Sequence, residues 1–137
     1  MRIRAIAASV LAVLTLAMIA LPEAALAADC RSRINLNATA AGVLVAASGH
    51  AEVRSKNLGT RQTLTVAVDV AVVDGTILSV FTNGNLAGSI TIVKGIGTLD
   101  LSNANGAPIP GGVVSVCDIA QVWVTDAAGA TLLIGSF

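Results

Sequence analysis

Hydrophobic and polar residues alternate along most of the chain after residue 30, a pattern typical of β-strands with one buried face. The clearest run covers residues 60–73, where every second residue from Leu64 to Val70 is aliphatic. Shorter runs of the same kind predict strands at residues 33–38, 49–56, 76–82, 86–93, 96–101 and 130–137. A longer run at residues 113–125 predicts a strand with a bulge near residues 117–120.

Turn-forming residues separate these runs. Asp74–Gly75 and Asn83–Gly84 are strong hairpin signals, and Lys94–Gly95 and residues 126–129 predict two further turns. Residues 102–112 are rich in Asn, Gly and Pro, which predicts a loop. The alanine-rich segment at residues 40–47 contains a glycine and a valine and shows no obvious helix cap, so we expect strand or loop there.

Seven or eight short strands without a clear helix predict a small antiparallel β-sandwich, in which two sheets share one aliphatic core. A small closed β-barrel is the alternative. The alternation assigns these side chains to the core: Leu64, Val66, Val68, Ile90, Ile92, Leu99, Val114 and Val124.

Residues 1–27 have the features of a cleaved secretory signal peptide. Arg2 and Arg4 precede an apolar run at residues 5–21, and the small-residue pattern of residues 25–27 marks a cleavage site. We therefore expect one exported domain at residues 28–137, located in the periplasm, outside the cell or on its surface. Once the signal is removed, no membrane association is expected. About 110 residues remain, which is enough for a single core.

Cys30 and Cys117 are the only cysteines. An oxidising compartment favours a disulfide between them, and no C-x-x-C redox motif is present. The bridge would close a loop of about 90 residues, worth about 4–5 kcal/mol in the chain-entropy model.

Charge is sparse and uneven. Residues 28–61 carry five basic and two acidic side chains, whereas residues 62–137 carry one basic and five acidic side chains. This division predicts either neighbouring strands of opposite charge or two poles suited to head-to-tail self-association. Uncharged segments at residues 40–47, 86–93 and 130–137 could supply unprotected strand edges, so the expected partner is a second copy or another exported protein. The few basic residues are not interleaved with aromatic ones, which argues against nucleic-acid binding.

Residues for catalysis are few. Ser48, His50 and Glu52 would share one face of a strand, where side chains point in parallel and do not converge as a hydrolase triad requires. One histidine and two pairing cysteines leave too few ligands for a zinc site. We therefore expect no catalytic residues, cofactor or metal, although a hydrolase built on those three residues is the catalytic alternative.

Trp123 is the one tryptophan, and its neighbours Val122 and Val124 are expected to face the core. An outward-facing indole could contact carbohydrate, although a tryptophan packed at the sandwich edge has the same sequence pattern. The sequence thus predicts a non-catalytic surface, matrix or binding module that acts through protein contacts. The alternatives are a carbohydrate-binding domain that uses Trp123 and, because the last strand ends on Phe137, a small outer-membrane β-barrel.

Overall fold

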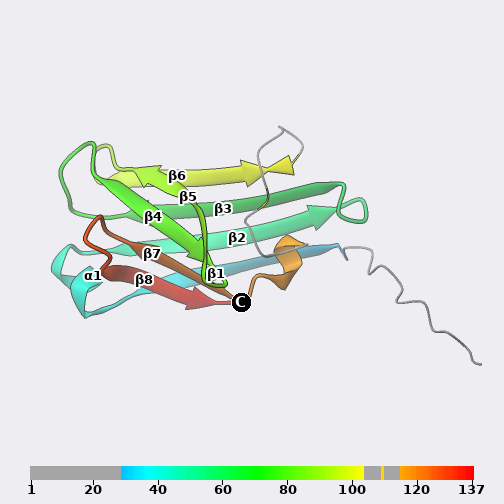
Figure 1. Cartoon of the computed structure of the whole chain (residues 1–137), viewed down its shortest axis with the longest axis horizontal. Helices are drawn as coiled ribbons and strands as arrows, with labels where there is room; N and C mark the ends of the chain where they lie inside the picture. The colour runs from blue at the N-terminus through cyan, green and yellow to red at the C-terminus, as the bar shows by residue number, and fades with distance from the viewer. Residues whose placement is uncertain (1–28, 104–108, 110–114) are drawn as a thin grey trace, which may run out of the picture.

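The computed structural model describes residues 29–103, 109 and 115–137, so the predicted signal peptide lies outside the described residues. The regular elements of the described chain are eight β-strands, one short helix and a 3-10 turn (Figure 1). In chain order the elements are β1 (Cys30–Ala38), α1 (Ala40–Leu44), β2 (Ser48–Lys56), β3 (Arg61–Asp69), β4 (Ile77–Thr82), β5 (Asn85–Thr91), β6 (Ile96–Ser102), η2 (Val116–Asp118), β7 (Gln121–Thr125) and β8 (Thr131–Ser136).

All eight strands belong to one antiparallel sheet with the order β5-β4-β7-β8-β1-β2-β3-β6. β1 joins its two halves, because residues 30–36 pair with β2 and residues 37–38 pair with β8. Figure 1 shows the half made by β4, β5, β7 and β8 folded over the other half. The predicted all-β fold is confirmed, and its two facing layers are halves of one nearly closed, barrel-like sheet.

The two edge strands of the sheet, β5 and β6, face each other along a seam that is filled by side chains. Only one bridge, between Val93 and Ile96, joins the two segments among the described residues. A Cβ atom on Gly97 would lie 2.3 Å from Cγ2 of Ile90, and a Cβ atom on Gly88 would lie 2.9 Å from Cδ1 of Leu99. These two glycines therefore let neighbouring aliphatic side chains fill the seam in place of ladder hydrogen bonds.

The core prediction is largely confirmed. Leu99 is half-buried because it covers the seam between β5 and β6, and Val114 lies outside the described residues. The other six predicted side chains are buried: Leu64, Val66, Val68, Ile90, Ile92 and Val124.

The predicted pairing of the strands on either side of Asp74–Gly75 is wrong. The turn exists, but β3 pairs with β2 and β6, whereas β4 pairs with β5 and β7. Residues 70–76 therefore cross from one half of the sheet to the other. The last strand is not an edge either, since β8 lies between β7 and β1. Of the segments without charge that were expected at an edge, β5 is the one that forms one.

Residues 40–44 form a helical turn, so the expectation of strand or loop is wrong. Thr39 caps the turn, because its Oγ1 accepts a hydrogen bond of 3.1 Å from the Gly42 amide. The Thr39 amide also donates to the Leu132 carbonyl at 3.0 Å, which attaches α1 to β8. A contact with a strand more than 90 residues away thus stabilises a turn that is too short to form alone.

The long strand predicted at residues 113–125 is also wrong. β7 begins only at Gln121, and the 3-10 turn η2 replaces the predicted bulge. The buried Gln62 side chain holds this turn, because its Oε1 accepts a hydrogen bond of 2.8 Å from the Val116 amide. The turn brings Cys117 to the beginning of β1.

The predicted disulfide is confirmed: Cys30 and Cys117 are bonded, with their Cα atoms 6.0 Å apart. A disulfide is consistent with an oxidising, exported compartment. In the part of the chain that the structure describes, no helix has the length and hydrophobicity needed to cross a bilayer.

Candidate functional surfaces

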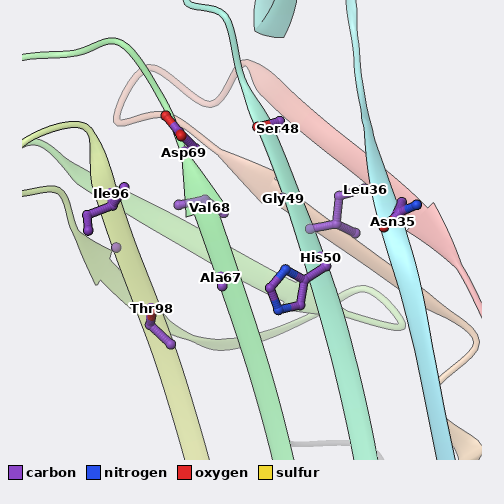
Figure 2. Close-up of a pocket in the computed structure, with 11 residues that line it drawn as sticks. Asn35, Leu36, Ser48, Gly49, His50, Ala67, Val68, Asp69, Ile96 and Thr98 are labelled. Carbon is purple, nitrogen blue, oxygen red and sulfur yellow. The ribbon is translucent and has the colours of Figure 1, made fainter.

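Ser48, His50 and Glu52 occupy alternate positions of β2, and their side chains project from the outer face of the sheet. His50 lines an open depression of about 560 Å³ formed by β1, β2, β3 and β6. In Figure 2 the imidazole lies beside Ala67 of β3, and Ser48 and Asp69 lie further along the strands. The predicted shared face is therefore present.

These three side chains do not form a catalytic arrangement in the structure. Across the sheet His50 faces Asn35 and Ala67, and no hydrogen bond joins its ring to a serine or carboxylate among the described residues. Glu52 instead contacts two arginines, at 3.6 Å from Nε of Arg31 and 3.9 Å from Nη2 of Arg54. A triad needs a nucleophile, an imidazole and a carboxylate joined in sequence, and this face presents them side by side. No cluster of three or more potential metal ligands occurs within the described ranges either.

Trp123 lies on the outer face of the other half of the sheet. Its neighbours Val122 and Val124 are buried, as the alternation predicted, while the indole itself is half-buried. Phe81 is directly opposite on β4, and the two rings stack with their centroids 5.8 Å apart and their planes 14° from parallel. Ile134 is directly opposite on β8 and is 40% exposed.

Leu86 pairs with Phe81 and extends this row onto β5, so four strands contribute to an outer strip made of Leu86, Phe81, Trp123 and Ile134. Phe81 was not predicted as the partner of Trp123. The alternation predicts that Phe81 faces outward, because Leu78 and Val80 face inward. It does not predict that β4 pairs with β7.

A second group of apolar side chains is exposed at the end of the barrel where α1 lies. Six aliphatic side chains there are between 52% and 86% exposed. They come from α1, the crossing segment 70–76 and the adjoining ends of β4, β5 and β6. We call this group the apolar end: Val43, Leu44, Val73, Ile77, Val93 and Ile96.

Hydrogen bonds hold the segments of the apolar end together. The Ala71 amide donates to the Val45 carbonyl at 2.8 Å, which joins the crossing segment to the chain after α1. On the other side, the Gly75 amide donates to the Ile92 carbonyl at 2.7 Å, and the Lys94 amide donates to Oδ1 of Asp74 at 2.7 Å. The six side chains therefore project from one connected framework.

Several acidic residues and most of the basic residues lie at opposite ends of the strands. Three carboxylates lie at the apolar end, on Asp69, Asp74 and Asp126, together with Lys94. The opposite ends of β1, β2 and β3 carry most of the basic side chains on their outer face. We call this group the basic face: Arg31, Arg33, Arg54, Lys56 and Arg61. Arg33 also faces Glu52 across neighbouring strands, so head-to-tail association through two poles stays a prediction.

Comparisons with protein-family models, curated proteins and solved structures find no match for this chain.

Proposed function

We propose that residues 28–137 form a non-catalytic module of the periplasm or cell exterior that binds or assembles through protein contacts. The observation that supports this proposal best is the apolar end. Scattered exposed aliphatic side chains are ordinary, but six that project from segments joined by hydrogen bonds at one end of the barrel are typical of a protein-interaction surface. The disulfide and the predicted signal peptide support an exported location.

The surroundings of the apolar end favour a protein partner. Its border carries Asp69, Asp74 and Lys94, so an apolar centre is combined with a charged rim, as in many protein interfaces. The uncharged edge strand β5 ends beside it. A second copy or another exported protein fits this combination.

Substituting serine for Leu44 and Val73 (L44S/V73S) is expected to weaken association about tenfold or more, because two large aliphatic side chains would leave the interface. Sedimentation velocity of the oxidised protein, lacking residues 1–27, measures this at two ionic strengths. Leu58→Ser is the control, since Leu58 is also exposed but lies in the turn between β2 and β3.

Two results would contradict the proposal. One is that L44S/V73S and Leu58→Ser weaken association equally. Association would then not depend on the apolar end. The other is a strict monomer at high micromolar concentration that also fails to capture any exported protein. An esterase or glycosidase activity abolished by His50→Ala would refute its non-catalytic part.

Carbohydrate binding through Trp123 is the second candidate, favoured by the stacked Phe81–Trp123 pair on the outer strip. Aromatic faces on an exposed sheet can contact the apolar face of a sugar ring. Trp123→Ala is expected to abolish binding on a glycan array, whereas Ile134→Ala, which leaves both rings in place, is expected to retain it. Binding that survives Trp123→Ala would remove this candidate.

A further inference from the structure

We propose that the basic face binds an anionic polysaccharide, meaning a linear glycan that carries carboxylate or sulfate groups. This site is distinct from the outer strip around Trp123, which lies on the other half of the sheet, and it does not depend on the proposed protein contacts. Five of the six Lys and Arg residues that follow residue 27 lie on it: Arg31, Arg33, Arg54, Lys56 and Arg61.

The register of the strands places like charges directly opposite each other. Arg31 faces Arg54 between β1 and β2, and Lys56 faces Arg61 between β2 and β3. Like charges at such positions destabilise a sheet, because their side chains start only about 5 Å apart. An anionic group bound between them would relieve both repulsions. Glu52 contacts Arg31 and Arg54 and faces Arg33, whereas neither Lys56 nor Arg61 forms an ion pair among the described residues.

The carboxylates available within the molecule do not neutralise this face. Glu52 is the one acidic residue among the strand positions of the basic face, and it is shared between Arg31 at 3.6 Å and Arg54 at 3.9 Å. Asp29 accepts a hydrogen bond of 2.9 Å from the Leu58 amide, and Asp100 of β6 accepts one of 2.9 Å from the Thr65 hydroxyl. Five basic side chains are thus set against these two carboxylates and Glu52. The face therefore keeps a positive potential toward solvent.

Arg54 is at the centre of the basic face. It lines a hollow of about 340 Å³ with Asp29, Arg31 and Lys56, and a second hollow of about 290 Å³ that Glu52 and Asp100 also line. Its side chain is 33% exposed, and Nε makes no hydrogen bond in the described part of the chain. An anion would therefore bind in the hollow that Arg54 shares with Arg31 and Lys56, where two guanidinium groups and an ammonium group lie together.

The chemistry around the basic face fits a glycan better than a protein. None of the exposed large aliphatic side chains of the described residues lies on β1, β2 or β3, so the apolar centre of a typical protein interface is lacking. The adjoining positions carry the hydroxyls of Thr63 and Thr65. The carboxylates at the apolar end of a second copy are a poorer match, because Asp74 is engaged by the Lys94 amide of a neighbouring turn and Asp126 by two amides of its own turn.

The test measures binding of the oxidised protein, lacking residues 1–27, to heparin, to polygalacturonate and to uncharged dextran by titration calorimetry. We expect binding to both anionic polymers but not to dextran, with affinity that falls as salt is raised. Arg54→Gln should weaken binding at least fivefold, and R54Q/K56Q at least twentyfold. Lys94→Gln is the matched control, since it removes the same single charge at the apolar end and should change affinity less than twofold. Circular dichroism and urea midpoints confirm that each variant is folded.

Three outcomes would overturn the proposal. Equal weakening by Lys94→Gln and Arg54→Gln would mean that only net charge matters. Binding to anionic lipid vesicles without binding to either soluble polymer would assign the face to a membrane surface. If R54Q/K56Q loses self-association and the wild type binds neither polymer, the basic face would be a contact surface for a second copy. Each outcome is separate from the L44S/V73S experiment, which tests the protein contacts.

Discussion

Replacing both cysteines with alanine (C30A/C117A) is expected to lower the free energy of unfolding by about 3–5 kcal/mol. The bridge spans 87 residues, and a cross-link of that length removes much conformational entropy from the unfolded chain. It also ties η2 to the beginning of β1, where the buried side chains of Val116 and Ile119 cover one end of the core. Without the bridge, the hydrogen bond from the Val116 amide to Gln62 remains as a polar attachment of this turn.

Urea denaturation of the wild type and of C30A/C117A measures this loss, and intact mass before and after reduction verifies the bridge in the wild type. The reduced wild type serves as the control, since it should unfold at nearly the same urea concentration as the double variant. A loss below about 1 kcal/mol would contradict the assigned role of the bridge.

Gly42→Ala is expected to destabilise the protein by about 3 kcal/mol, although glycine to alanine normally stabilises a helix. A Cβ atom at this position would lie 2.0 Å from the Leu132 carbonyl oxygen and 2.9 Å from its carbon. These are backbone atoms of β8, so the clash cannot be relieved by rotating a side chain. α1 would have to move away from β8, which would break the bond from the Thr39 amide to the Leu132 carbonyl.

The matched control is Ala40→Gly, at an exposed position of the same helical turn. This substitution should cost about 1 kcal/mol or less, through helix propensity alone. Urea denaturation of both variants separates the two effects. A Gly42→Ala protein as stable as the wild type would show that α1 can leave β8 without loss. Since Val43 and Leu44 belong to the apolar end, the same displacement should also weaken association.

Local sequence determined most of the strands and some of the turns. The alternation around Leu64 and Val66 placed β3 and its buried face correctly, because a strand repeats every two residues wherever one side is covered. Asn83–Gly84 predicted the hairpin between β4 and β5, and both residues adopt positive φ, at 48° and 88°. With two cysteines and a predicted signal peptide, the disulfide followed from the sequence.

Local sequence also determined which side chains could become functional. The outward position of Trp123 and the shared face of Ser48, His50 and Glu52 were predicted from the same two-residue repeat. None of these predictions required knowledge of strand order, because each depends on residues within one strand.

Only the tertiary structure decided which segments meet. The helical turn α1 exists because Thr39 and Gly42 fit the backbone of β8, and η2 exists because Gln62 and Cys30 hold it. The order of the strands in the sheet could not be predicted from local sequence either, because the two-residue repeat of a strand does not depend on which strand lies beside it. The order of the strands places Phe81 opposite Trp123 and Arg31 opposite Arg54. It also brings together the segments that carry the apolar end. The sequence by itself specified the strands and their buried faces, whereas these surfaces arise from long-range pairing, because contacts between distant segments are absent from any local pattern.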